Sequence, residues 1–550
     1  MTSYLSAPRA RPSVEHVLAV RGTGGYRQYR IPALAVSTAG TILAAYDGRP
    51  NLDDLPNTID LLLRRSRDNG ATWGEQQVVR TGTGLNGYGD PSLLVDADTG
   101  RIFMFHAAGT HAGFFEAVAG LEPDDAVQHA DVSYSDDDGG TWHHRRLTSS
   151  LKPVHSGTTG LFAAAGQGIQ MHTGPFKGRL VQQYVLLVDG EIMAASALSD
   201  DHGESWTLGA LIGTGPAGIG PNENKVVCLA DGRLLLHSRA TPCRLAAISE
   251  DGGQTWGPLT PVPDLPDPSD NGSLTRFDGL PLVQLPAEAD SSHWLIATNN
   301  QDPHLRRNTV LSLSPDNGAT WPGKLVLCEG SSAYSTATRL PDGNVGVLYE
   351  RQGYREIVFA SVPAEQLVSQ LASAPSTLPS ADRDPLTFHM ELRSVTPGRP
   401  AHWQNAGEFH VIPSNSDGAW DVQTWKEIGQ GYAGQDQVLG TREAQDLNYG
   451  AIIPGYKAGD ILAFTGRVRN SGTEPLADVV LLGPHGSDFP ATRLEPGQQS
   501  LYFTPSYTVT ESDLLADALE LRFAVESDGG RFRTERRFRF ELRTGSVAAS

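Results

Sequence analysis

The chain has 550 residues and a mass of 58.9 kDa, which is more than one compact core usually holds, so we expect at least two domains. Its formal net charge of −20 and its pI near 5.2 argue against nucleic acid or an anionic membrane surface as a partner. The 60 glycines and 36 prolines favour a turn-rich, all-β chain.

The N-terminal segment has no apolar stretch of signal-peptide length, and no run in the chain approaches the length of a membrane span. We therefore expect no membrane insertion. The compartment stays open: the protein is cytoplasmic, or it is secreted and its leader has been removed. Residues 14–20 have the pattern of a strand. We expect this strand to pair with the last repeat of the first domain, which would remove a free sheet edge.

Five copies of the motif Ser-x-Asp-x-Gly-x-Thr/Ser-Trp divide the first part of the chain. They begin at Ser66, Ser135, Ser199, Ser249 and Ser314. A motif that returns every ~50 to 70 residues indicates one supersecondary unit repeated along the chain. The aspartate can accept hydrogen bonds from turn amides, the glycine can adopt positive φ, and the tryptophan can pack at a sheet edge. We therefore expect each copy to be a hairpin turn of the scaffold.

Several short strands per repeat predict a six-bladed β-propeller over residues 14–366, in which a stretch without the motif, near 334–362, supplies the sixth blade. Residues 367–385 are expected to form a linker. Alternating strands such as Gly459–Asn470 then predict a smaller immunoglobulin-like β-sandwich over 386–545. The expected fold class is thus all-β. The second domain is read as a spacer or accessory module, with carbohydrate binding as the alternative.

Charged and aromatic residues gather in short segments between the repeated motifs. In chain order these segments are Tyr29–Pro32, Tyr46–Pro50 with Asp53 and Asp54, Asn222–Lys225, His237–Arg239, His304–Thr309, Tyr334–Thr336 and Leu348–Glu350. Each is weak evidence by itself, because most arginines and glutamates lie at solvated surfaces. Their order relative to the repeated motifs is what makes them informative.

The repeated motifs resemble Asp-boxes, and in this chain five of them follow the segment Arg30–Pro32, which resembles the Arg-Ile-Pro signature of sialidases. This combination is similar to bacterial exo-α-sialidases. The resemblance covers about residues 20–362 and leaves the C-terminal domain outside it. It implies a retaining glycoside hydrolase that removes terminal α-linked sialic acid from glycans, with no cofactor and no metal. The three cysteines fit no zinc pattern, and the acidic run Asp136–Asp138 lies within a box and is more simply turn structure.

The resemblance assigns Arg30, Arg239 and Arg306 to an arginine triad that grips the sialic acid carboxylate. Guanidinium suits this role, because it is planar, permanently charged and able to bind a carboxylate through two hydrogen bonds. Glu350 matches the glutamate that orients the first arginine. Arg307 stays an alternative to Arg306, and the Asn308 context favours Arg306.

Tyr334 matches the nucleophile of the family, and Glu223 matches its base. A carboxylate nucleophile would be repelled by the carboxylate that the reacting carbon already bears. A neutral phenol that loses its proton during attack avoids this repulsion. Sialidases are accordingly an exception to the rule that glycosidases use two carboxylates.

The general acid/base is expected on the loop after Arg49. Asp54 and Asp53 both qualify, and the Asp-Leu-Pro context favours Asp54. Arg49 itself matches an arginine near the C4 substituent of the sugar, and Asp90 matches an aspartate near the glycan pocket. For these last two residues a structural role is about equally favoured.

Other functions stay open beside hydrolysis. A trans-sialidase would use a sugar hydroxyl in place of water, and related hydrolases act on ulosonic acids such as Kdn or Kdo. A propeller that binds glycans or proteins without catalysis is the alternative from another class, and the retained charged set speaks against it. The expected partner is a sialylated glycan. Linkage preference and oligomeric state are not fixed by the sequence, although a monomer is favoured.

Overall fold

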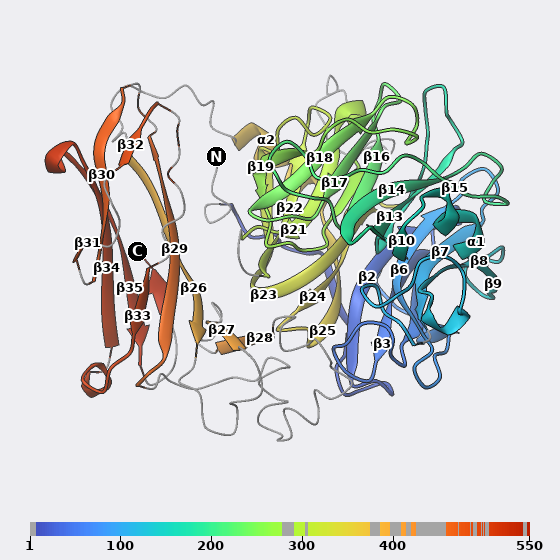
Figure 1. Cartoon of the computed structure of the whole chain (residues 1–550), viewed down its shortest axis with the longest axis horizontal. Coiled ribbons are helices and arrows are strands. Elements are labelled where there is room, and N and C mark those ends of the chain that lie inside the picture. Colours follow the sequence, from blue (N-terminus) through green and yellow to red (C-terminus); the bar gives the residue numbers. More distant parts are fainter. Residues whose placement is uncertain are drawn as a thin grey trace. The chain divides into compact units, whose positions relative to one another are not determined.

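The computed structural model describes residues 7–109, 111–277, 291–302 and 306–373, followed by 386–396, 409–413, 420–424, 458–470, 472, 474–484, 486–487, 492–496, 498, 500, 505–516, 518–542 and 547–549. The chain divides into two compact units, Met1–Ala374 and Pro375–Ser550 (Figure 1). Strands provide most of the regular structure that is described, so the expectation of an all-β chain is confirmed.

Four sheets of the first unit follow one another along the chain. Their hydrogen-bonded orders are β2–β3–β4–β5, β11–β6–β7–β8–β9, β10–β13–β14–β15 with β12 beside β13, and β16–β17–β18–β19. The strands are β2 (Gln28–Val36), β3 (Ile42–Arg49), β4 (Asp60–Ser66), β5 (Gln77–Arg80), β6 (Gly87–Val95), β7 (Ile102–Gly109), β8 (His129–Ser135), β9 (His143–Arg146), β10 (Thr158–Ala163), β11 (Gly166–Gln167), β12 (Ile169–Gln170), β13 (Leu180–Val188), β14 (Glu191–Ser199), β15 (Thr207–Leu208), β16 (Asn224–Cys228), β17 (Leu234–Ser238), β18 (Cys243–Ser249) and β19 (Thr260–Pro266).

A fifth, seven-stranded sheet has the order β1–β25–β24–β23–β22–β21–β20. Its strands are β1 (Val14–Val20), β20 (Ser273–Arg276), β21 (Leu295–Asn300), β22 (Arg307–Ser314), β23 (Gly323–Arg339), β24 (Val345–Arg351) and β25 (Glu356–Val362). The first half of the long strand β23 pairs with β22, and its second half pairs with β24. The sheet therefore consists of two four-stranded parts that share β23. As expected from the sequence, the early strand β1 pairs with β25.

The first strands of the sheets contact one another in a closed order. β2 contacts β6, β6 contacts the segment β10–β12, β12 contacts β16, β16 contacts β20, β20 contacts β23, and β23 returns to β2. Buried apolar side chains fill the space between neighbouring sheets, as Leu34 and Leu62 do against Leu348 and Phe359. The closed order brings the starts of strands that are hundreds of residues apart in the chain to one region.

Each repeated motif begins with the last residue of one strand and forms the turn to the next: β4 to β5, β8 to β9, β14 to β15, β18 to β19 and β22 to β23. In the first copy Ser66 Oγ accepts a 2.9 Å bond from the Gly70 amide, and Asp68 accepts a 2.9 Å bond from the Thr72 amide. The other four copies repeat these bonds. Gly70 has a φ of 85°, as the pattern requires. The motifs are therefore scaffold turns, including the one that contains Asp136–Asp138.

The expected linker begins later than the sequence suggested. Residues 367–373 belong to α2 (Ala364–Ser373), and Leu367 is fully buried in the core of the seven-stranded sheet. Leu367 and Leu371 are four residues apart, so they lie on one face of a helix and both pack against this core. The rest of the expected linker, 374–385, lies outside the described residues. The other described helices of this unit are single turns: α1 (Thr148–Leu151), η2 (Asp124–Ala126), η3 (Lys152–Val154) and η4 (Ser291–His293).

In the second unit, two described sheets pack around one apolar core. One sheet has the order β28–β27–β26–β29–β33 and the other β31–β30–β34–β35–β36, with β32 beside β30. The strands are β26 (Leu386–Thr396), β27 (Phe409–Pro413), β28 (Trp420–Thr424), β29 (Ile461–Asn470), β30 (Leu476–Gly483), β31 (Gly486–Ser487), β32 (Thr492–Leu494), β33 (Ser506–Thr508), β34 (Ala518–Ser527), β35 (Phe532–Glu541) and β36 (Val547–Ala549), and the 3-10 turns are η8 (Asp513–Leu515) and η9 (Asp528–Gly530). Phe464 of the first sheet lies 4.7 Å from Phe523 of the second, ring centroid to ring centroid.

Within the described ranges, no helix combines the length and the apolar character needed to cross a membrane.

Candidate active site

Tyr334 and Glu223 form a buried hydrogen-bonded pair. Tyr334 lies in the second half of β23, and Glu223 directly precedes β16. The tyrosine hydroxyl donates to Glu223 Oε2 over 2.7 Å. Arg239 directly follows β17. Its guanidinium donates to the Tyr334 hydroxyl over 2.5 Å and also to Glu223 Oε2. One cation thus bridges the phenol and the carboxylate.

The surroundings of this pair keep the phenol protonated and the carboxylate ionised. Burial raises the pKa of Tyr334 well above its ordinary value. Burial also tends to raise the pKa of Glu223, but the charges of Arg239 and Lys225 outweigh it, so that the pKa of Glu223 is lowered. The Glu223 carboxylate is therefore ionised and placed to accept the phenol proton along the Tyr334–Glu223 hydrogen bond as the phenol is consumed in an attack.

Three arginines from different sheets surround the Tyr334 ring. The guanidinium carbons of Arg30, Arg239 and Arg306 lie 5.2, 5.9 and 5.1 Å from the ring centroid. The structure thus brings together all three arginines that the sequence comparison singled out. Three like charges repel one another, so such a group needs nearby carboxylates or an anionic ligand.

Glu350 holds the first of these arginines. It is the next-to-last residue of β24 and has a fully buried side chain, and its Oε1 accepts bonds of 2.8 Å from Arg30 Nε and from the Ile31 amide. Its Oε2 accepts a 3.2 Å bond from the Tyr334 amide. Ile31 has a φ of 62°, a strained conformation for a β-branched residue, at a break in the pairing of β2 with β3. The strain aims the amide of Ile31 at the same carboxylate that holds Arg30.

The structure separates Arg306 from Arg307. Arg306 donates to the Tyr354 hydroxyl and to the Ser269 carbonyl, each over 3.2 Å. Arg307 instead donates to Asp302 over 2.6 Å. Consecutive residues entering a strand point to opposite faces, so only one of the two can face Tyr334.

Arg49 ties the expected acid/base loop to the site. It is buried at the end of β3 and donates to Asp54 Oδ1 over 2.9 Å and to the Asp53 carbonyl over 3.1 Å. On its other side it contacts Asp47 with bonds of 2.6 and 3.0 Å. The Asp54 side chain is 65% exposed, so its carboxylate is held at one oxygen and open to solvent.

Asp90 lies beside this arginine group. It has a φ of 63° at a break in the pairing of β6 with β7, and its amide donates to Asp47 Oδ1 over 3.2 Å. Burial raises the pKa of Asp90 well above its ordinary value, and the neighbouring carboxylates Asp47 and Asp54 raise it further. Burial likewise raises the pKa of Asp47 to about 6. Asp90 therefore belongs to a cluster of carboxyls around Arg49.

Sequence reasoning missed two residues of this site. Asp47 had a signal, because residues two apart in a strand share a face and Asp47 precedes Arg49 by two. Tyr354 had none: it lies in the turn after β24 with a φ of 64°. Its ring lies 4.2 Å below the Arg30 guanidinium carbon, and its hydroxyl accepts a bond from Arg306. It therefore contacts two of the three arginines.

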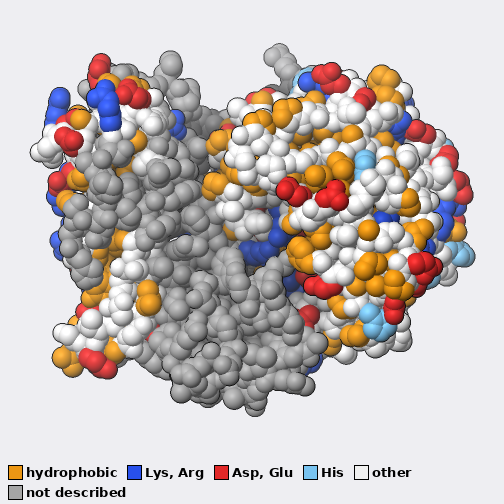
Figure 2. Space-filling model, viewed as in Figure 1, with side chains coloured by type: hydrophobic (Ala, Val, Ile, Leu, Met, Phe, Trp, Pro, Cys, Tyr) orange, Lys and Arg blue, Asp and Glu red, His pale blue; other side chains and the backbone are white. Residues whose placement is uncertain are grey.

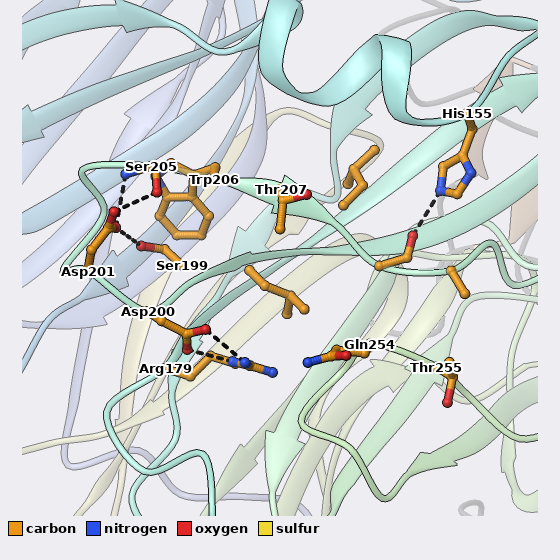
Figure 3. A pocket seen from close by; sticks show the side chains of 14 residues that line it. His155, Arg179, Ser199, Asp200, Asp201, Ser205, Trp206, Thr207, Gln254 and Thr255 are labelled. Atoms are coloured by element: carbon orange, nitrogen blue, oxygen red, sulfur yellow. Dashed lines mark hydrogen bonds and ion pairs between the residues drawn. The ribbon is translucent and has the colours of Figure 1, made fainter.

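A separate cavity of about 680 Å³ lies on β14 and β15 and their neighbours (Figure 3). None of the candidate site residues described above lines it. Its charged side chains are paired within its wall, since Arg179 contacts Asp200 over 2.8 Å and Asp201 serves its own turn. On the face of the first unit seen in Figure 2 acidic side chains are spread over the surface, whereas Arg30 and Arg49 are buried.

Comparison with known proteins identifies the family of the chain. The model of the BNR repeat-like domain family matches residues 40–347, which is more than half of the chain. The chain belongs to the BNR repeat-like domain family. The resemblance to bacterial exo-sialidases that the sequence indicated is confirmed at the level of the family, because its curated relatives are sialidases.

The relatives differ in how much they share with the chain. A sialidase of Micromonospora viridifaciens is 44% identical over 344 residues, which are 61% of this chain and 52% of the relative. The chain thus matches about half the length of that protein. Among solved structures, the Hadza microbial sialidase Hz136 has a TM-score of 0.57 and 28% identity, covering 64% of this chain and 69% of that one. The intramolecular trans-sialidase of Ruminococcus gnavus, at 18% identity, 64% and 97% coverage and a TM-score of 0.54, shares the fold.

Proposed function

We propose that the chain is a retaining exo-α-sialidase that hydrolyses terminal α-linked sialic acids of glycoconjugates. The observation that carries this proposal is the buried Tyr334–Glu223 pair within three arginines. A sugar that bears a carboxylate at its anomeric carbon suits this arrangement, because the arginines bind the carboxylate and a neutral phenol can approach the same carbon. The similarity to sialidases over the same residues supports the proposal.

In the first step the substrate carboxylate lies against Arg30, Arg239 and Arg306. The Tyr334 oxygen attacks the anomeric carbon and forms a bond to it, while Glu223 accepts the phenol proton. Asp54 donates a proton to the leaving oxygen as the glycosidic bond breaks. The exposed carboxylate of Asp54 and its bond to Arg49 support this role over Asp53, whose backbone is what Arg49 contacts.

In the second step water attacks the same carbon and releases Tyr334. Asp54, now a carboxylate, removes a proton from the water, and the proton on Glu223 returns to the tyrosine oxygen. Two displacements at one carbon restore the original configuration. The bridging Arg239 stabilises the negative charge that the Tyr334 oxygen carries as it attacks and as it leaves.

We infer that the first unit is a six-bladed β-propeller and that the second is an immunoglobulin-like sandwich. Support for the first comes from the closed order of the inner strands and from six four-stranded groups, two of which share β23. Support for the second comes from its two sheets around a common core. A propeller gathers the starts of its inner strands around one axis, and this is where the proposed site lies.

The proposal is tested by initial rates of the purified chain on 4-methylumbelliferyl-α-N-acetylneuraminic acid, followed by proton NMR of the products. Release of sialic acid first as the α anomer is the expected result. A β anomer as first product would contradict the retaining mechanism. An internally cyclised sugar, or transfer to an added galactoside, would instead support a trans-sialidase. No reaction would favour another ulosonic acid or a binding role.

A further inference from the structure

The loop between β19 and β20, residues 267–272, contacts two arginines of the triad. The Ser269 carbonyl accepts a 3.2 Å bond from Arg306 Nη2, and the Ser269 hydroxyl accepts a 3.3 Å bond from Arg239 Nε. Asp270 lies next in the chain, with its Oδ1 3.6 Å from Arg306 Nε. Three oxygen atoms of this one loop thus contact two of the three arginines.

The Asp270 side chain is an anomaly within this loop. It is fully buried, yet among the described residues neither of its carboxylate oxygens makes a hydrogen bond. Its neighbour Asp267 differs, because it accepts bonds from Arg244 Nη1 over 2.8 Å and from the Asp270 amide over 2.7 Å. Buried carboxylates normally accept several hydrogen bonds, so an exception at a site calls for an explanation.

The charges that face Asp270 come from several elements. Arg306 precedes β22, Arg239 follows β17, Lys225 lies on β16, and Glu350 lies on β24. Asp267 and its partner Arg244 complete the set. Asp270 is therefore placed between cations that attract it and two carboxylates that repel it. Such a carboxyl responds to a further negative charge bound on the far side of its arginine.

We infer that Asp270 is a positioning residue for Arg306 and that it takes up a proton when the substrate carboxylate binds the arginine triad. The inference rests on the proposed function. In the empty site the Asp270 carboxylate balances part of the charge of Arg306. When the substrate carboxylate arrives, it takes over that role, and Asp270 becomes a neutral carboxylic acid by accepting a proton from solvent.

The acid–base properties of Asp270 agree with this exchange. The pKa of Asp270 is raised to about 7, chiefly by burial; Asp267 and Glu350 contribute to the rise, and Arg306 opposes it. A bound anion raises the pKa again, so binding takes up protons at pH values above about 7. Substrate binding therefore weakens as the pH rises through the pKa of Asp270 in the free enzyme. Well below that pKa, substrate binding does not depend on the protonation of Asp270.

The test compares the pH dependence of KM for wild type and Asp270→Asn on 4-methylumbelliferyl-α-N-acetylneuraminic acid, from about pH 6 to about pH 8.5. We expect the ratio of wild-type KM to variant KM to rise several-fold over this range, while the corresponding ratio of kcat stays level. The ratio cancels groups that titrate in the same range and do not face Asp270, such as Asp47.

A ratio that is constant with pH would overturn the inference, even if the variant has a uniformly higher KM, since that result would mean a merely structural role. Absence of turnover by the wild type would be a failure of the proposed function and is visible before any variant is made. Asp302→Asn is the matched control, because it removes a buried carboxylate that pairs with Arg307. Its KM ratio to wild type should not vary with pH.

A second variant decides the matter if Asp270→Asn does not fold. Asp267→Asn removes a negative neighbour that raises the pKa of Asp270. The rise of KM should then begin at a lower pH than in the wild type. An unchanged starting point would contradict the inference.

Discussion

The hydroxyl of Tyr334 donates a 2.7 Å hydrogen bond to Glu223, although 111 residues separate the two in the chain. The bond aligns the proposed nucleophile with the group that we propose removes its proton. Replacement of Tyr334 by Phe deletes the attacking oxygen and leaves the ring that packs among the arginines. We expect hydrolysis of the fluorogenic sialoside to fall by at least ~10³-fold.

The matched control for this change is Tyr184→Phe. The Tyr184 hydroxyl is also buried, but no described residue forms a hydrogen bond with it. Turnover of this variant should stay near that of the wild type. Near-normal turnover of Tyr334→Phe would remove the tyrosine from its proposed role.

Asp54→Ala tests the assignment of the general acid. A poor leaving group needs a proton and a good one does not, so the loss should be large on a natural sialyl galactoside, about 10² to 10⁴-fold, and small on the 4-methylumbelliferyl substrate. Both substrates are assayed with Asp53→Ala as control. If Asp53→Ala is the variant with this dependence on the leaving group, the acid is Asp53.

Glu350→Gln tests how the first arginine is held. The carboxylate accepts three bonds, from Arg30, Ile31 and Tyr334, and a neutral amide cannot balance the charge of Arg30. We expect kcat/KM to fall by about 10²-fold or more while the chain remains folded by circular dichroism. Glu356→Gln, which removes an acceptor of Arg351 in the same sheet, should leave kcat/KM within a few-fold. Equal losses in both variants would mean general damage to the sheet.

Lys225 should make stability depend on pH. Burial lowers the pKa of Lys225 from 10.5 to about 7. Below about pH 7 the buried lysine is charged in the folded chain, and its charge destabilises the fold. Between about pH 7 and about pH 10 Lys225 is neutral in the folded chain and still charged in the unfolded chain. The destabilisation therefore decreases as the pH rises through this range. In urea titrations, the stability of Lys225→Met relative to wild type should therefore be highest near pH 6 and decline towards pH 9. The exposed Lys177, replaced by Met, should give a difference that varies less, and a decline equal to that of Lys225→Met would contradict the prediction.

The boundary of the first unit is testable by truncation. A chain that ends at Ala374 keeps α2 and should hydrolyse the small substrate at a rate close to that of the full chain. A chain that ends at Pro363 loses the buried Leu367 and should be less stable by several kcal/mol, since burial of a leucine in a core contributes about 2–5 kcal/mol. Thermal unfolding of both fragments checks this. An unfolded Ala374 fragment would show that the first unit needs the second.

Much of this architecture could be anticipated because its signals are local. The box residues Ser66, Asp68 and Gly70 define one turn within five positions, and the pairing of β1 with β25 follows from the need to cover a sheet edge. The three arginines, Tyr334 and Glu223 were assigned through the resemblance to sialidases, which their order relative to the boxes made specific. The structure then brought them to one place.

Other features left only a weak local signal in the sequence, or none. The helical continuation to residue 373 was hidden by a composition rich in Ser and Ala, and only the four-residue spacing of Leu367 and Leu371 pointed to it. Tyr354 and Asp270 matter through partners that are distant in the chain, namely Arg30 and Arg306. A single sequence carries no record of such contacts, because they arise when the sheets close into a ring.

The pairing of β1 with β25 also joins segments that are synthesised at the beginning and near the end of the first unit. Arg30 leaves the ribosome early in synthesis, whereas its partner Glu350 lies 320 residues later and only a few positions before β25. Until that late segment is made, Arg30 has no counter-charge and the opening sheet has no neighbour on one side. Glu350 and the strand that pairs with β1 are therefore made close together, and a nascent chain released before residue 350 contains neither of them.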